Sequence, residues 1–522
     1  MTSHDHIESD PFADPSLHEA QADFRENSTL TVGRNATLTL GTDSLIVLDE
    51  GFTAQRETTN CCGLIESKTT RAIPFFNVLW AELSEYDITI HYAHPTSKTV
   101  VRVAYIQYLV DKPDRPRATS WIARLLDRAY GQSQRNKRIK VLINPFGGQG
   151  SAQKWFTRDI EPIFIAARCR VDVERTQFRG HAIEIAEKLD IDAFDVVASC
   201  SGDGLPYEVF NGLGKKPDAQ WALKKIALVQ LPCGTGNAMS WNLNGTDSTS
   251  MAALCVVKGL RTPLDLVSIT QGETRTLSFL SQSVGIVAES DLATEHLRWL
   301  GSARFTYGIL IRLLRKTMYP CDLAIKVEIP TKAQVKEHYQ SQVKSRKPHE
   351  EQPTVLDRQT RESPQETRLP PLKYGSINDP LPSDWSMVPY DKMGNFYSGN
   401  MAYMAPNANF FPATLPSDGY LDLVTIDGDI SRTAALQSLL AVEKGTFFDM
   451  PHVQYRKISG YRIVPRDQKD GYISIDGERV PFAPFQAEVH RGLGTVLSRS
   501  GLMYEAEGVK SNTTTTGYTD SG

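Results

Sequence analysis

The sequence of 522 residues has no apolar run approaching the ~18 residues that a membrane-spanning helix requires. Its N-terminus is acidic and polar, and it lacks the apolar core of a secretory signal peptide. A basic excess is also missing, because 57 Lys and Arg residues stand against 61 Asp and Glu residues. These absences argue against a membrane-spanning, secreted or nucleic-acid-binding protein. We expect a cytoplasmic chain that meets membranes only at their surface.

Cysteine is scarce, and the seven cysteines are odd in number, unlike the paired framework of a disulfide-rich secreted domain. Most lie singly inside apolar segments. The adjacent pair Cys61-Cys62 is the exception, and two interpretations stay open for it. The two thiols are either tolerated in a loop or sites of S-acylation that would add a lipid anchor. A Walker A loop is also absent, since no Gly-Lys-Ser/Thr follows a glycine cluster.

Composition is typical of a folded protein of two or more domains, with 40% hydrophobic and 23% charged residues. Both ends, residues 1–35 and 501–522, are polar, and we expect them to be disordered. Alternating apolar runs over 36–112 predict a small β-rich module, and a pleckstrin-like membrane-docking module is one interpretation of it. Residues 113–136 form a basic, helix-like linker, either a solvated charged face or a segment attracted to anionic lipid.

From residue 137 the pattern changes to alternating strands and helices. This predicts an α/β nucleotide-binding lobe over 137–262. From Pro263 the pattern becomes β-rich, with one strand predicted from Ser283 to Ala288, so the fold class is α/β followed by all-β. We assign 263–331 and 383–500 to this second lobe. Residues 332–382 are charged, Pro-rich and almost free of apolar clusters, and they predict a flexible insertion.

Three buried strands of the α/β region each end in a glycine-rich turn. The turns are Asn144-Pro145-Phe146-Gly147-Gly148, Ser201-Gly202-Asp203-Gly204 and Pro232-Cys233-Gly234-Thr235-Gly236-Asn237. Ligands of open α/β sheets bind at the carboxyl ends of the strands, where glycines let backbone N–H groups approach a phosphate. Any one of these sequences alone is compatible with an ordinary tight turn. Together they predict a nucleotide or phosphate site.

Two later segments carry charges that suit such a site. Asp291, Arg298 and Arg304 lie around Gly301, and the arginines would suit phosphate oxygens. A surface ion-pair segment is the alternative there. Nearer the C-terminus, Asp476-Gly477-Glu478 follows a predicted strand, and a plain type I′ hairpin turn is the alternative.

These motifs, in this order, resemble the catalytic domain of sphingosine kinases, and of the fungal long-chain-base kinases in particular, within the diacylglycerol kinase family. The resemblance covers about Lys137 to Leu497, apart from the insertion. It implies a Rossmann-like nucleotide-binding lobe followed by a β-sandwich lipid-binding lobe. It also implies transfer of the γ-phosphoryl group of ATP, with Mg²⁺, to the primary hydroxyl of sphingosine, sphinganine or phytosphingosine. Such an enzyme would act at a membrane surface, and a homodimer is compatible with this interpretation.

The resemblance also implies a role for each matched residue. Asp203 would take the proton from the lipid hydroxyl, and Asp291 would pair with the lipid head. Asp476 or Glu478 would lie near the metal. The apolar sleeve around the lipid chain would begin at Ile286, Val287 and Phe305. The residues implied to bind ATP are Asn144, Gly147, Gly148, Thr176, Ser201, Gly202, Gly204, Glu208, Gly234, Gly236, Arg298, Arg304, Asp476, Gly477 and Glu478.

The chain departs from the family pattern in the first glycine turn. Gln149 and Ser151 stand where relatives commonly have lysines, and Phe146 stands where some have arginine, which removes positive charge near the phosphates. The alternative functions are a ceramide or diacylglycerol kinase, a soluble NAD kinase, or a lipid-sensing protein without catalysis. The acid at Asp291 favours a sphingoid base, whose ammonium group diacylglycerol lacks. Intact Asp203 argues against a non-catalytic protein.

Overall fold

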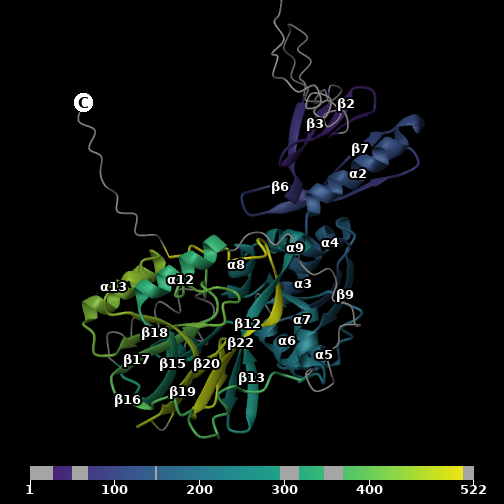
Figure 1. Cartoon of the computed structure of the whole chain (residues 1–522). Coiled ribbons are helices and arrows are strands. Elements are labelled where there is room, and N and C mark those ends of the chain that lie inside the picture. The colour runs from purple at the N-terminus through teal and green to yellow at the C-terminus, as the bar shows by residue number, and fades with distance from the viewer. Residues whose placement is uncertain are drawn as a thin grey trace, which may run out of the picture. The chain divides into compact units, whose positions relative to one another are not determined.

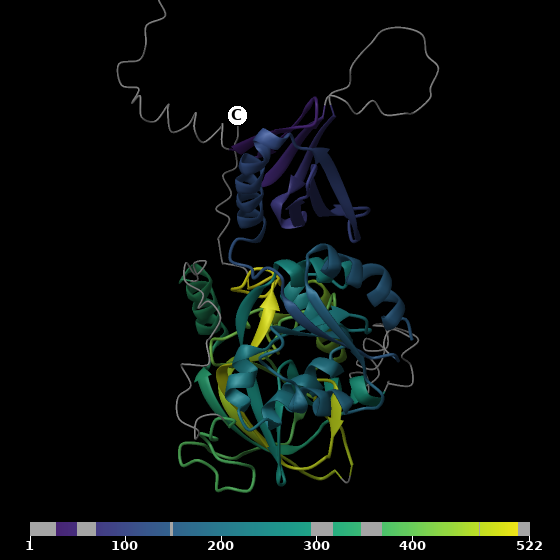
Figure 2. The same cartoon turned by 90° about the vertical axis from the view of Figure 1, so that its right-hand side faces the viewer.

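The computed structural model describes residues 28–49, 69–146, 150–293, 317–345, 368–468 and 470–509, apart from the side chains of residues 291 and 293. The chain divides into two compact units (Figures 1 and 2). The first is Met1–Gly131 with Ala166–Arg168, and the second is Gln132–Ile165 with Cys169–Gly522. Among the described residues, no helix combines the length and apolar character needed to cross a bilayer.

The N-terminal unit contains two antiparallel sheets, followed in the sequence by a helix. In β2 the buried Ala36, Leu38 and Leu40 alternate with partly exposed threonines, as in a strand with one face in the core. The first sheet comprises β1 (Thr29–Val32), β2 (Ala36–Leu40), β3 (Ser44–Asp49) and β4 (Thr69–Pro74), and the second comprises β5 (Val78–Leu83), β6 (Asp87–Pro95) and β7 (Val101–Leu109). Strand β1 lies within residues 1–35, the segment expected to be disordered, so that expectation is corrected for these four residues. Cys61 and Cys62 lie outside the described residues.

Helix α2 (Arg115–Tyr130) lies in the segment expected to be a basic, helix-like linker; the helix is present, but it belongs to the N-terminal unit and is not a linker. Its apolar face is buried, and the indole N–H of Trp121 donates to the carbonyl O of Ser28 at 3.0 Å. Two of its arginines donate to main-chain carbonyls of the first sheet: Arg117 to Thr29 and Arg128 to Gly41. The helix is thus part of the N-terminal unit, and these arginines fasten it there.

Fifteen strands of the second unit form one continuous sheet. Its parallel part has the order β11-β10-β8-β9, and every residue of β10 and β11 is buried, as expected for strands inside a parallel sheet. These strands are β8 (Arg138–Ile143), β9 (Arg170–Arg175), β10 (Val196–Ser201) and β11 (Ala227–Pro232). The helices of this part are α3 (Ala152–Trp155), η3 (Phe156–Ile160), α4 (Glu161–Ala166), α5 (His181–Lys188), α6 (Gly204–Lys215), α7 (Ala219–Lys225), α8 (Ala238–Asn244) and α9 (Thr249–Lys258).

The rest of the sheet is mostly antiparallel. Its strands are β12 (Leu260–Gln271), β13 (Thr274–Ser278), β14 (Ser281–Gly285), β15 (Cys321–Ile329), β16 (Val388–Tyr390), β17 (Met393–Gly399), β18 (Leu421–Asp427), β19 (Gln454–Pro465), β20 (Ile473–Ile475), β21 (Glu478–Val480) and β22 (Phe485–Ser498). Strand β22 joins the two parts, because it pairs with β12 and β19 and, at Val496, runs parallel to β11. The sheet therefore continues through residue 263, where the second lobe was expected to begin.

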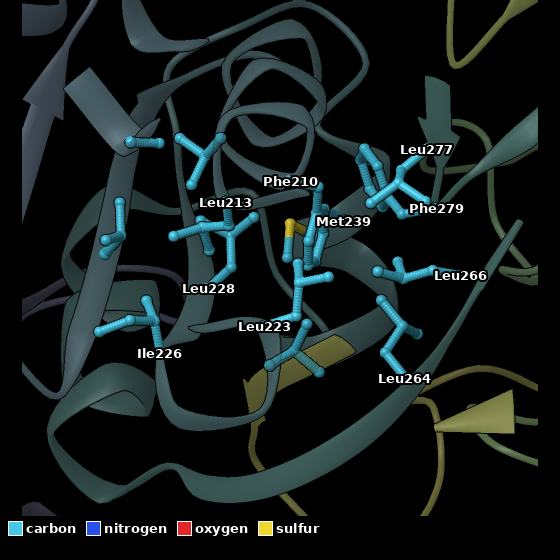
Figure 3. Close-up of a cluster of buried hydrophobic side chains, with 14 of the residues drawn as sticks. Phe210, Leu213, Leu223, Ile226, Leu228, Met239, Leu264, Leu266, Leu277 and Phe279 are labelled. Carbon is cyan, nitrogen blue, oxygen red and sulfur yellow. The ribbon is translucent and has the colours of Figure 1, made fainter. Parts of the chain in front are cut away.

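The described residues of this unit include three buried clusters. In the first, Phe210 and Leu213 of α6 gather with Leu228 of β11, Met239 of α8 and Leu266 of β12 (Figure 3). The other two clusters lie on opposite faces of β17, as its neighbours Phe396 and Tyr397 show by packing into different clusters. We call the cluster around Tyr397 the aromatic cluster. Val335 of α12 (Lys332–Ser345) and Ala441 and Val442 of α13 (Arg432–Glu443) belong to it, and Figure 1 labels the two helices.

Three further expectations need correction. Helix α10 (Ile286–Ala293) begins where a strand was expected to continue to Ala288. The insertion is folded at both ends: Val335 of α12 is fully buried, and the Glu488 carboxylate accepts from the N–H groups of Lys373 and Tyr374. The start of the C-terminal tail is also packed, since the Tyr504 hydroxyl donates to the carbonyl O of Asn400 at 2.6 Å.

Replacing Trp121 by Ala should destabilise the N-terminal unit by about 3–5 kcal/mol, because it removes a buried ring and the hydrogen bond from its indole N–H to the Ser28 carbonyl. Calorimetry of the whole chain should show a lower transition for that unit. The matched control is Ala123→Ser, at an exposed position of the same helix. Equal transition temperatures for the two variants would contradict a structural role of α2.

Candidate functional site

The glycine turns after β10 and β11 touch through their backbones. A Cβ atom built on Gly234 would lie 2.4 Å from the Cα of Gly202, a separation that real side chains do not tolerate. The N–H of Cys233 donates to the carbonyl O of Ser201 at 3.0 Å, and that of Asn144 to the carbonyl O of Cys200 at 3.2 Å. The three predicted turns therefore meet at one edge of the parallel strands. Gly147 and Gly148 of the first turn lie outside the described residues.

Asn237 closes the third turn and starts helix α8. Its backbone is left-handed, with φ of 51°, a conformation that asparagine tolerates better than most residues. Its side-chain oxygen accepts from the N–H of Gly234 at 2.8 Å, and its amide donates to the carbonyl O of Gly234 at 2.9 Å. These two hydrogen bonds between the Asn237 side chain and the Gly234 backbone fix the direction in which α8 leaves the turn.

The first N–H groups of α8 bind the Asp203 carboxylate. The N–H of Ala238 donates to Oδ2 and that of Met239 to Oδ1, both at 3.0 Å, and the Gln230 amide also donates to Oδ1, at 3.2 Å. Burial raises the pKa of Asp203, and these donors oppose that rise because they favour the ionised form. A Cβ built on Gly236 would lie 3.5 Å from Oδ2 and from the carbonyl O of Met404. Oδ2 therefore lies toward Gly236 and Met404.

Asp476 and Gly477 form the two-residue turn between β20 and β21. Their φ angles of 53° and 81° are those of a type I′ turn, so the structure has the hairpin that was the alternative interpretation. The Asp476 carboxylate accepts from the Ser278 hydroxyl and from three successive N–H groups that end at Ser281. Burial raises the pKa of Asp476 to about 6. Since its oxygens are engaged within the protein, Asp476 serves as a structural anchor, and we withdraw it as a metal ligand.

The same hairpin brings Glu478 to the start of helix α6. A Cβ built on Gly204 would lie 3.2 Å from Glu478 Oε1, and the Glu478 carboxylate forms an ion pair with Arg179. Glu208, expected at the nucleotide, instead accepts from the N–H groups of Gly180 and Ala182 at the start of α5. It thereby fixes the segment after β9, which Arg179 occupies.

Two other expected ATP ligands are engaged with the main chain. The N–H of Thr176 donates to the carbonyl O of Ile143 at 2.9 Å, and the Ser201 hydroxyl donates to the carbonyl O of Gly202 at 2.6 Å. The structure thus brings Ser201, Gly202, Gly204, Gly234, Gly236 and Glu478 around Asp203, with Asn144 and Thr176 at the ends of the two neighbouring strands.

The expected lipid-contacting residues are only partly described. Ile286 is buried in the cluster that contains Phe396, while Val287 packs against the aromatic cluster, as Met404 also does. The side chain of Asp291, and Arg298, Arg304 and Phe305, lie outside the described residues. Among the residues that are described, no group of three or more His, Cys, Asp or Glu side chains could hold a metal ion.

Sequence reasoning missed Gln230, Arg179 and Met404. For Gln230 a signal existed, because it is a lone polar residue in the apolar strand from Ala227 to Leu231. A polar side chain at such a position must find a buried partner. Arg179 and Met404 carried no comparable signal, since their contacts to Glu478 and near Gly236 depend on the tertiary fold.

Comparison of the sequence with known proteins identifies the family of the chain. A family model described as the diacylglycerol kinase catalytic domain matches residues 138–269, and a domain of unknown function (DUF7493) matches 28–131. Sphingoid long chain base kinase 5 of Saccharomyces cerevisiae is 34% identical over 470 residues, which cover 80% of this chain and 68% of that protein. Sphingoid long chain base kinase 4 of Schizosaccharomyces pombe is 32% identical over 82% of this chain and 88% of that protein. Human sphingosine kinase 1 is 30% identical over 68% of this chain and 88% of that protein.

The chain belongs to the sphingoid long-chain-base kinase family. The match to the first family model ends at residue 131, and the match to the second begins at residue 138. The compact units divide at Gly131, so the unit of unknown function and the unit that carries Asp203 correspond to separate family models.

Replacing Gly234 by Ala should force the two glycine turns apart, because the new Cβ would overlap Gly202. We expect a destabilisation of about 1–3 kcal/mol, typical of overpacking. The control is Gly236→Ala in the same turn, whose Cβ has room at 3.5 Å from its nearest neighbours. Thermal unfolding of both variants measures the difference, and equal stability would argue against the backbone contact.

The hairpin offers a second matched pair. Asp476→Asn should destabilise the fold by about 1–3 kcal/mol, because an amide cannot accept every hydrogen bond that the carboxylate accepts. Glu478→Gln, two residues away, should change stability by less than about 1 kcal/mol, since its ion pair is largely exposed. Urea denaturation compares them; a larger loss for Glu478→Gln would reverse these assignments.

Proposed function

We propose that this chain is an ATP-dependent kinase that phosphorylates the primary hydroxyl of sphingoid long-chain bases. The names of its relatives, in yeasts and in humans, support the substrate class. The observation that carries the proposal is the Asp203 carboxylate, held by Ala238, Met239 and Gln230 at the carboxyl ends of parallel strands. A carboxylate fixed in this way beside glycine-rich turns suits phosphoryl transfer, which depends mainly on positioning and electrostatics.

In this proposal the parallel part of the sheet is the Rossmann-like nucleotide-binding lobe. The turns that contain Gly148, Gly202 and Gly234 would offer backbone N–H groups to the phosphates of ATP. Arg298 and Arg304 would add the positive charge that the first turn, with Gln149 and Ser151, lacks. The antiparallel part would be the β-sandwich lipid-binding lobe.

Asp203 would act as the base. As its Oδ2 takes the proton of the lipid hydroxyl, the hydroxyl oxygen bonds to the γ-phosphorus and the bond to the β-phosphate oxygen breaks, which releases ADP. ATP would supply the phosphoryl group, and a bound Mg²⁺ ion would offset the negative charge that develops during the transfer. Of the two carboxylates expected near the metal, Glu478 fits a Mg²⁺ ion held mainly by phosphates, because Asp476 is engaged elsewhere.

The lipid would approach from the side of Gly236. Met404, whose carbonyl lies there, packs on the aromatic cluster together with Val287 and Phe410. These partly buried apolar side chains suit an alkyl chain, and Asp291 would attract the ammonium group of the lipid head. Because the substrate resides in membranes, the enzyme would work at a membrane surface.

Purified protein with labelled ATP should label sphinganine and phytosphingosine in preference to ceramide and diacylglycerol. Asp203→Asn should lower this labelling by about 10²-fold or more, because the amide cannot accept the proton. Circular dichroism should show that the variant remains folded. Labelling of diacylglycerol alone would refute the role of Asp291, and retained turnover by Asp203→Asn would remove Asp203 as the base.

A further inference from the structure

Gln230 is fully buried in β11 and connects two parts of the site. Its Oε1 accepts from the N–H of Ser240 in α8 at 2.9 Å, and its Nε2 donates to Asp203 Oδ1 at 3.2 Å and to the carbonyl O of Ser201 at 3.4 Å. Because the N–H of Ser240 can only donate, the amide oxygen must face α8, and the NH₂ group must face Asp203. The orientation of this amide is therefore determined by Ser240 on one side and by Asp203 and Ser201 on the other.

The two carboxylate oxygens of Asp203 differ in their partners. Oδ1 accepts from the N–H of Met239 and from the Gln230 amide, while Oδ2 accepts from the N–H of Ala238. Oδ2 thus retains a lone pair on the side where Gly236 and the Met404 carbonyl lie. The hydrogen bond from Gln230 also restricts rotation of the carboxylate about its own axis.

We propose that Gln230 is a positioning residue that selects Oδ2 of Asp203 as the proton acceptor and tunes its basicity, an inference that rests on the proposed function. Gln230 touches no substrate. It acts by engaging Oδ1, so that Oδ2, on the side of Gly236 and Met404, is left to accept the proton.

The charges around Asp203 make this role measurable. Burial raises the pKa of Asp203, and the donor from Gln230 opposes that rise. The neighbouring elements contribute Glu478, which is paired with Arg179, and Glu208, which is bound by N–H groups of the α5 start. None of these charged groups hydrogen-bonds to Gln230, so a substitution there should leave their interactions in place.

Two variants separate the contributions of Gln230. Gln230→Met keeps the length of the side chain but removes both the donor to Asp203 and the acceptor for the N–H of Ser240. Gln230→Glu keeps an acceptor for Ser240 but places a second carboxylate beside Asp203. The control is Ser199→Ala, which removes a buried polar atom from the paired position on β10; that hydroxyl has no partner among the described residues.

Three measurements are needed: thermal unfolding, kcat and KM against pH, and the carboxyl resonance of Asp203 in protein labelled with ¹³C-aspartate. The rate should fall at low pH as Asp203 is protonated. Gln230→Met should move this acidic limb to higher pH by about one unit, and Gln230→Glu should move it further, because two adjacent carboxylates share a proton. For Gln230→Met we also expect kcat to fall about 10- to 100-fold with little change in the KM for ATP. Ser199→Ala should match the wild type.

The outcomes distinguish this inference from the proposed function. If the wild type phosphorylates sphinganine and Asp203→Asn does not, an unshifted acidic limb in Gln230→Met overturns the role of Gln230 alone. If the wild type has no kinase activity, the proposed function fails, and the carboxyl titration then decides whether Gln230 tunes Asp203. A loss of kcat that only parallels a loss of stability, with an unchanged titration, would reduce Gln230 to a structural residue.

Discussion

The backbone contact between Gly202 and Gly234 is the constraint on which the site depends. Adjacent parallel strands leave the sheet in register, with Ser201 beside Pro232, so the two turns emerge side by side. A Cβ at Gly234 would separate them. The contact sets where Asn237 turns the chain into α8, and hence where the N–H groups of Ala238 and Met239 point. The position of the Asp203 carboxylate therefore depends on the absence of a side chain at Gly234, which follows the neighbouring strand.

The second constraint is the continuity of the sheet across both parts of the larger unit. Strand β22 pairs with β11, β12 and β19, so the parallel and antiparallel strands share one hydrogen-bonded framework. The β20–β21 hairpin is fixed to this framework by the Asp476 carboxylate, which binds the turn before β14. As a result Glu478 reaches Gly204, although the two residues are far apart in sequence. A rigid sheet is thus what allows distant loops to share one site.

The sequence predicted the parts of the molecule whose cause is local. Buried β-branched runs and glycine turns located β8, β10 and β11, and the type I′ turn at Asp476-Gly477 was foreseen as an alternative. Partners could not be foreseen, because residue type does not determine them. Glu208 and Glu478 are both acidic, yet one caps a helix and the other faces the site. Likewise the arginines of α2 bind main-chain carbonyls, a choice that only the packing of the helix decides.

The insertion shows that amino-acid composition, too, does not predict contacts with other elements. Few apolar residues between 332 and 382 suggested a flexible segment, since such a segment buries too little surface to offset its loss of entropy. Part of it is nevertheless held by polar contacts: Gln486 donates to the carbonyl groups of Tyr374 and Gly375, and Arg462 donates to that of Ser376. The donors lie on rigid strands, so little further entropy is lost when the segment binds them. The hydropathy of residues 332–382 cannot predict these contacts, because the side chains that donate the hydrogen bonds belong to other strands.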